Sequence, residues 1–184
     1  MLDRGLSPFN HVERAPVEGV PASPDQLELQ AFLGRFQRDE PNDSVRARID
    51  AAIELAIAPL SWPVRVVARP ALRFTAHLPD WIAIEQTDGL LGVTFSGGIV
   101  LRAELGGPRR LHHLPGATKG QVRHFCRAGQ LWTEVSSDAG QITNVYERSA
   151  EDELIGRVQL ESRHLPLPVL YAVRLRRQRS QHLG

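Results

Sequence analysis

Two residues in the second half of the chain, His124 and Tyr171, carry side chains suited to proton transfer. An imidazole removed from water can change its protonation near neutral pH, and a buried phenol can polarise a carbonyl group. If the protein is an enzyme, we predict that these residues are its general base and general acid. If it is not, both are hydrogen-bonded residues of the interior.

A second group of residues has the side-chain types of a metal site. It consists of His112, His113, His124 and Cys126, which fall within fifteen residues. The group lacks the short repeated spacing of zinc-finger ligands or of two histidines on one helix face. His112 and His113 also lie in a segment bounded by Gly and Pro, which indicates an exposed loop. We therefore predict no bound metal and no other cofactor.

The composition is typical of one soluble globular domain. The chain has 184 residues, 42% of them hydrophobic, and a formal net charge of +1. This charge balance argues against a nucleic-acid-binding protein, whose surface is usually strongly basic. The sequence has no run of about 18 apolar residues, which a transmembrane helix requires, and no signal-peptide pattern. We expect a cytoplasmic monomer or homodimer without a membrane-inserted segment.

The first third of the chain is expected to hold a flexible arm and one or two helices. Residues 1–22 combine Pro and Gly without apolar periodicity, which is typical of a mobile arm. A short helix is predicted to begin at Ser23, and residues 32–38 fit either a helix or a strand. Apolar residues spaced three and four apart predict a helix over 43–58.

The segment 61–78 has no clear assignment from its pattern. Residues 64–67 suggest a strand, which Pro63 and Pro70 would interrupt. The path of this segment is left open.

From residue 81 onward the apolar pattern alternates with a period of two, which predicts strands. Tight turns, of which Asp88-Gly89 is an example, separate them. The predicted strands are 81–87, 90–95, 99–105, 121–127, 130–136, 141–148, 153–161 and 169–177. Closure of such a meander removes its exposed edges. The predicted fold is therefore mainly β: an antiparallel up-and-down barrel of about eight strands with one or two N-terminal helices, forming a single domain over 23–178 with a basic tail at 179–184.

Charged residues mark the outer face of most strands, so side chains of the opposite parity point inward. Strand 141–148 is ambiguous, because Asn144 and Tyr146 share one face while Val145 and Glu147 share the other. The predicted interior is mostly aliphatic with a few polar tips, which is the usual form of a small-molecule pocket. The predicted ligand-binding residues are Leu101, Val122, His124, Cys126, Leu131, Thr133, Tyr146, Val158, Tyr171 and Val173.

Several motifs together resemble those of bacterial lipocalin-like proteins. They are Gly34-Arg35-Phe36, the run Asn42-Asp43-Ser44 before a helix, and the late segments 145–149 and 163–169. In that family a Gly-x-Trp motif opens the first strand, and the last strand carries arginines near its end; this chain has Phe36 in place of the Trp. The resemblance implies a calycin-type barrel that binds a small apolar molecule.

Three functions are compatible with this pattern. The first is binding of a small hydrophobic molecule in the barrel. The second is a cofactor-independent isomerase or cyclase that holds an apolar substrate in the same cavity, with His124 and Tyr171 polarising it. The third is a structural or assembly protein whose barrel is filled by its own side chains.

Overall fold

Alternating apolar and polar residues place most of the chain in one antiparallel sheet. The computed structural model describes residues 28–76, 79–114 and 118–178. The predicted arm (1–22), the predicted helix start at Ser23 and the basic tail (179–184) lie outside these ranges. The strands are β1 (Gly34–Arg38), β2 (Trp81–Thr87), β3 (Leu90–Phe95), β4 (Val100–Glu104), β5 (Arg110–His113), β6 (Lys119–Arg127), β7 (Gln130–Ser137), β8 (Gly140–Ala150), β9 (Glu153–Glu161) and β10 (Val169–Arg177).

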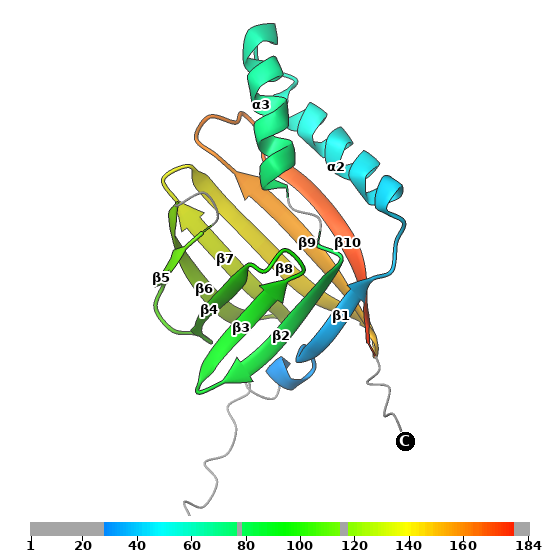
Figure 1. Cartoon of the computed structure of the whole chain (residues 1–184), viewed down its shortest axis with the longest axis vertical. Helices are drawn as coiled ribbons and strands as arrows, with labels where there is room; N and C mark the ends of the chain where they lie inside the picture. Colours follow the sequence, from blue (N-terminus) through cyan, green and yellow to red (C-terminus); the bar gives the residue numbers. More distant parts are fainter. Residues whose placement is uncertain (1–27, 77–78, 115–117, 179–184) are drawn as a thin grey trace, which may run out of the picture.

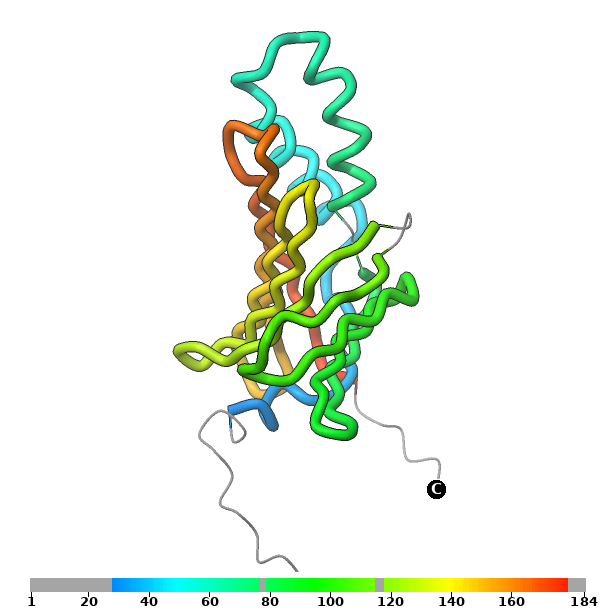
Figure 2. The backbone as a smooth tube through the Cα atoms, turned by 90° about the vertical axis from the view of Figure 1, so that its left-hand side faces the viewer, coloured from blue at the N-terminus to red at the C-terminus, as the bar shows by residue number. Residues whose placement is uncertain are grey.

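The sheet rolls into a nearly closed barrel (Figure 1). Its strand order is β4-β3-β2-β1-β10-β9-β8-β7-β6-β5. Consecutive strands are therefore neighbours except β4 and β5, which stand at the two ends of the order, and β1 also pairs with β10. In the side view, the green strands β2–β4 face the yellow-to-red strands β8–β10 across the interior (Figure 2). The mainly-β antiparallel barrel is therefore confirmed.

The predicted number of about eight strands is wrong, because the described residues form ten. The eight predicted segments are all strands, and the two additions are β1 and β5. The β1 segment falls in the stretch whose pattern fitted both helix and strand. The β5 segment has four residues and includes His112 and His113, for which the sequence wrongly predicts an exposed loop. Such a short segment has too few residues to show alternation, and its pairing with β6 decides its conformation.

The barrel closes between β4 at one end of the strand order and β5 and β6 at the other. Here a few individual contacts replace a regular ladder. The Gly106 N–H donates to the His124 carbonyl at 2.8 Å, and His112 Nε2 lies 2.5 Å from the Arg102 carbonyl oxygen. Leu105 also forms an isolated bridge with His124. Isolated backbone contacts and the His112 side chain therefore join the two sides of this seam.

Two helices follow β1 in the sequence and precede β2, and both lie at one end of the barrel (Figure 1). Helix α2 (Asn42–Ile57) agrees within a residue at each end with the predicted 43–58. It packs next to β10 through a buried stripe that includes Val45, Ile49 and Ile53. The apolar periodicity of this segment therefore correctly predicts which face of the helix is buried.

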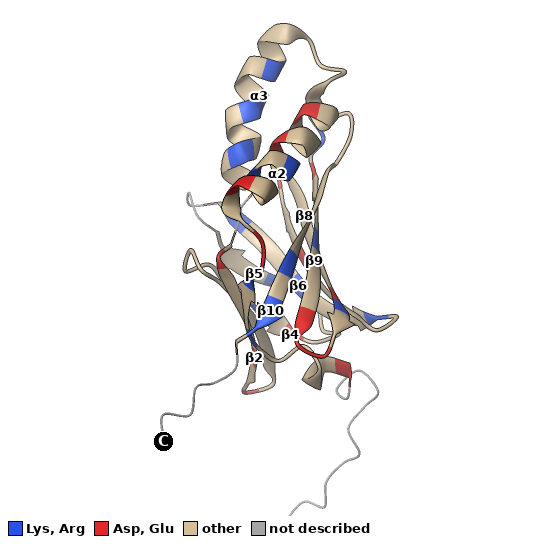
Figure 3. Ribbon diagram, turned by 90° about the vertical axis from the view of Figure 1, so that its right-hand side faces the viewer, with Lys and Arg blue, Asp and Glu red and all other residues tan. Residues whose placement is uncertain are grey.

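Helix α3 (Trp62–Thr75) corrects the strand suggested within 61–78. Ser61 precedes the helix and Pro63 lies in its first turn, where a proline is compatible with helical geometry because that N–H has no partner within the helix. Leu72 is the buried apolar residue of α3. Arginines along α3 face acids of α2 (Figure 3), with ion pairs Arg69–Glu54 and Arg73–Asp50.

The opposite end of the barrel is closed by a packed base. Leu29, Phe32 and Phe36 are fully or almost fully buried there. The Arg177 guanidinium lies 4.6 Å from the centre of the Phe36 ring, and it donates to the Ala31 carbonyl at 2.9 Å and to the carbonyl of Leu33. The Phe36 ring and the Arg177 guanidinium thus pack together at this base.

Candidate ligand-binding site

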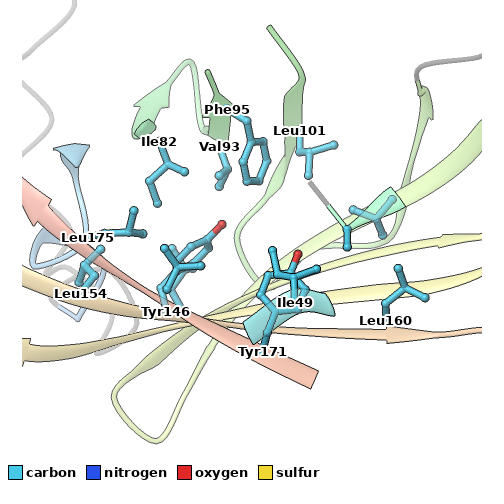
Figure 4. Close-up of a cluster of buried hydrophobic side chains, with 14 of the residues drawn as sticks. Ile49, Ile82, Val93, Phe95, Leu101, Tyr146, Leu154, Leu160, Tyr171 and Leu175 are labelled. Carbon is cyan, nitrogen blue, oxygen red and sulfur yellow. The ribbon is translucent and has the colours of Figure 1, made fainter. Parts of the chain in front are cut away.

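A cavity of about 440 Å³ occupies the barrel interior between the packed base and the helices. This volume is within the range of small-molecule sites. Its wall comes from both halves of the sheet, and the residues at its centre include Leu101 of β4, Tyr146 of β8, Val158 of β9 and Tyr171 of β10. Figure 4 shows Tyr146 and Tyr171 with their hydroxyls directed toward the strands that carry Phe95 and Leu101.

The cavity reaches the helical end of the barrel. Its lining there includes Phe74 and Thr75 at the end of α3, Thr118 before β6, and Ser137 and Ala139 at the β7–β8 turn. The Phe74 side chain is mostly exposed although it borders the cavity. Residues far apart in the sequence thus form a mouth next to α3, and a ligand can enter there without passing through the packed base.

The predicted inward parity of the strands agrees with the observed burial. On β10, Val169, Tyr171, Val173 and Leu175 are buried while the residues between them are partly or fully exposed. For the ambiguous strand β8, the structure places Asn144 and Tyr146 inside. The reason is the pairing of Tyr146 with Leu131 on β7 and with Gly156 on β9, both of which are buried.

The ten predicted ligand-binding residues divide into two groups. Five of them line the cavity: Leu101, Tyr146, Val158, Tyr171 and Val173. The other five belong to the packed part of the wall near β6 and β7: Val122, His124, Cys126, Leu131 and Thr133. Contact with a ligand stays a prediction for both groups, but the geometry favours the first.

His124 is fully buried and both of its ring nitrogens have partners. Nε2–H donates to the Leu101 carbonyl of β4 at 3.2 Å, and Nδ1 accepts from the Thr133 hydroxyl of β7 at 3.0 Å. Burial lowers the pKa of His124 to about 4, so the ring is neutral at pH 7. The bond to Leu101 links β6 to β4 across the seam, so the role of His124 in this structure is to stabilise the barrel.

Two polar side chains of β8 lie at the cavity wall, and one of them has no hydrogen-bond partner among the described residues. The Tyr146 hydroxyl is buried and unpaired, and Asn144, two residues earlier on the same face, is also buried. Burial raises the pKa of Tyr146, and the neighbouring Tyr171 adds to the shift. Burial likewise raises the pKa of Tyr171. Both phenols therefore stay protonated at neutral pH.

Several lining residues were not among the predicted ligand-binding residues. Asn144 and Gly156 are the informative ones. Inward parity would have indicated both, but Asn144 lay on the strand whose two faces looked equivalent, and a glycine offers no side chain to classify. A Cβ at Gly156 would lie 3.6 Å from the Tyr146 ring, an ordinary van der Waals distance, so the ring packs directly over β9.

Within the described ranges, no group of three or more His, Cys, Asp or Glu side chains is placed to hold a metal ion. His112 and His124 lie on the paired strands β5 and β6 and contact different backbone groups of β4: His112 points to Arg102, and His124 points to Leu101. No helix among residues 28–76, 79–114 and 118–178 is long and apolar enough to span a bilayer.

Comparison with known proteins shows similarity in structure and none in sequence. No protein-family model and no curated protein sequence matches the chain. A secretory abundant heat soluble protein from Ramazzottius varieornatus has 11% identity and a TM-score of 0.54, with 80% of this chain and 96% of that chain covered. Apo lipid binding protein 8 from Caenorhabditis elegans has 10% identity and a TM-score of 0.51, with 82% and 97% covered. At these identities the likeness establishes a shared fold, the nearly closed antiparallel barrel described above.

Proposed function

We propose that the chain binds a small hydrophobic molecule in the barrel cavity. The observation that carries this proposal is the cavity of about 440 Å³ lined largely by aliphatic and aromatic side chains. Native interiors are packed almost without voids, so an unfilled apolar space of this size favours a ligand. The C. elegans protein that shares the fold is named as a lipid binding protein, which is in line with this proposal.

The expected affinity follows from the apolar area that a ligand would bury. A ligand that loses about 300 Å² of apolar surface gains roughly 7 kcal/mol before the entropic costs of binding are subtracted. Micromolar affinity corresponds to about 8 kcal/mol, so polar contacts must contribute. Tyr146 and Asn144 can supply them, since both lie at the cavity wall.

The two alternative functions draw less support. A structural protein with a filled barrel does not account for the cavity. An isomerase or cyclase that uses His124 as its base would have to break the bond from Thr133, because His124 has no free ring nitrogen. Tyr171 lines the cavity, but His124 belongs to the packed wall. We also propose, from the sequence pattern, a cytoplasmic bacterial protein that is a monomer or homodimer.

Filling the cavity tests the proposal. Nile red, an uncharged dye whose emission shifts to the blue in apolar surroundings, is titrated into the purified protein. We expect saturable binding that Val158→Phe weakens at least tenfold, because the added ring enters the cavity. Leu170→Phe is the matched control, since Leu170 lies exposed on the outer face of β10, and it should bind the dye as the wild type does.

Urea unfolding of each variant shows whether it is folded before its dye binding is compared. The proposal is refuted if the wild type shows no saturable dye binding, or if Val158→Phe and Leu170→Phe bind the dye equally well.

A further inference from the structure

We propose that the cavity selects uncharged ligands with one oxygen acceptor, which the Tyr146 hydroxyl binds, and that it rejects carboxylates of the same length. This inference rests on the proposed function and narrows it to a chemical class. Long-chain esters, ketones and alcohols belong to the favoured class, and fatty-acid anions do not.

The first argument is the absence of charge around the cavity. Among the described residues that line it there is no Arg, Lys, His, Asp or Glu. Arg157 and Arg176 lie on the outer face of the barrel, where Arg157 pairs with Glu147 and Arg176 pairs with Asp39 at 2.7 Å. Arg177 is held in the packed base by two backbone carbonyls and does not line the cavity. Of the residues that the structure describes, none that lines the cavity would therefore offer a cation to a ligand carboxylate.

An unpaired buried carboxylate is strongly disfavoured. Removing an ion from water costs several kcal/mol in proteins unless a partner of opposite charge or several donors compensate. The lining offers only hydroxyls and one amide, which suit a neutral oxygen. An ester loses far less hydration on entering the cavity, so charge is the property on which this cavity discriminates.

The second argument is the unpaired hydroxyl of Tyr146. The residue is 3% exposed, and its hydroxyl has no hydrogen-bond partner in the described part of the chain. A buried donor without a partner destabilises a protein by roughly 1–3 kcal/mol, and nearly all buried polar groups in native proteins are paired. A carbonyl oxygen of a ligand would accept from this hydroxyl, and the penalty would then be removed on binding.

Tyr146 is also held in a position that suits this task. Its ring lies over Gly156, where a Cβ would come within 3.6 Å of it. Figure 4 shows the hydroxyl directed across the interior toward the strand that carries Val93. Asn144, on the same face of β8, places an amide beside it. The ligand's oxygen is expected next to β8, with its hydrocarbon chain toward the mouth near Phe74.

The test uses displacement of Nile red at pH 7.5 by three probes of similar length. Methyl decanoate carries a neutral acceptor, decanoate carries a charge, and undecane carries neither. We expect methyl decanoate to bind at least tenfold more tightly than decanoate. Tyr146→Phe should weaken methyl decanoate about five- to tenfold and leave undecane within twofold.

The same variant separates a ligand contact from a structural role. Because Tyr146→Phe removes an unpaired buried hydroxyl, the ligand-free variant should be at least as resistant to urea as the wild type. A less stable variant, equal displacement by decanoate and methyl decanoate, or unchanged ester affinity in Tyr146→Phe would each overturn the inference. Failure of Nile red to bind the wild type would instead refute the proposed function, and the selectivity inference would fall with it.

Discussion

Protonation of His124 is expected to weaken the barrel at mildly acidic pH. The ring is fully buried in β6 and bonded to Leu101 and Thr133. Burial lowers its pKa from 6.5 to about 4. Between these values the unfolded chain binds a proton at this residue and the folded chain does not. The stability contributed by the neutral ring is therefore present above pH 6.5 and is lost as the pH falls toward 4.

The size of the effect follows from the two pKa values. Proton linkage over this range predicts that the free energy of unfolding falls by about 2 kcal/mol between pH 7 and pH 5. Such a change is a large fraction of the roughly 5–15 kcal/mol by which a domain is stable. We expect the loss of stability to arise at the seam, because His124 connects β6 to β4 where no regular ladder of hydrogen bonds joins the strands.

Urea unfolding of the wild type and of His124→Gln at pH 7 and pH 5 measures this contribution. Glutamine does not titrate, so the stability difference between the two proteins should shrink by about 2 kcal/mol at the lower pH. His113→Gln, which removes an exposed histidine, controls for the loss of an imidazole as such. A wild-type advantage over His124→Gln that is the same at both pH values would refute the reasoning.

Three further predictions concern the base of the barrel and the helices. Arg177→Ala should lower the free energy of unfolding by about 3 kcal/mol, because two backbone carbonyls and the Phe36 ring lose their partner; Arg176→Ala, which breaks only an exposed ion pair, should lower it by less than about 1 kcal/mol. Urea unfolding compares the two, and equal losses would contradict this account. Gly34→Ala should be destabilising by about 1–3 kcal/mol, because Gly34 has φ +132° and its Cβ would lie 2.6 Å from Arg177 Nη1; an unchanged urea midpoint would argue against it. Leu72→Ala should speed amide hydrogen exchange in α3 and leave β8 and β9 unchanged, since Leu72 is the buried apolar residue of that helix; uniform acceleration over the whole chain would show that α3 does not open separately.

Most strands of the barrel could be predicted because alternation and turn residues, which are local features of the sequence, determine them. Asp88-Gly89 and Ala128-Gly129 have positive φ at both positions, as the two-residue turns between right-twisted strands require. The sequence marks such turns directly. Segments with both helix and strand features could not be assigned in this way. Helix α3 contains several β-branched valines, yet Pro63 in its first turn and packing against α2 make it a helix. Packing of this kind overrides local propensity.

The alternation of side chains along each strand by itself determined which residues point into the barrel, since every second residue of a strand faces the same side. It did not determine which of those residues surround empty space. His124 and Tyr171 both point inward, but the first is enclosed by hydrogen bonds in the packed wall and the second borders the cavity. That difference depends on the volumes of side chains from ten strands and two helices together, and a volume enclosed by segments distant in the chain exists only once they are packed. The tertiary structure therefore decided where a ligand fits and which polar groups are left to meet it.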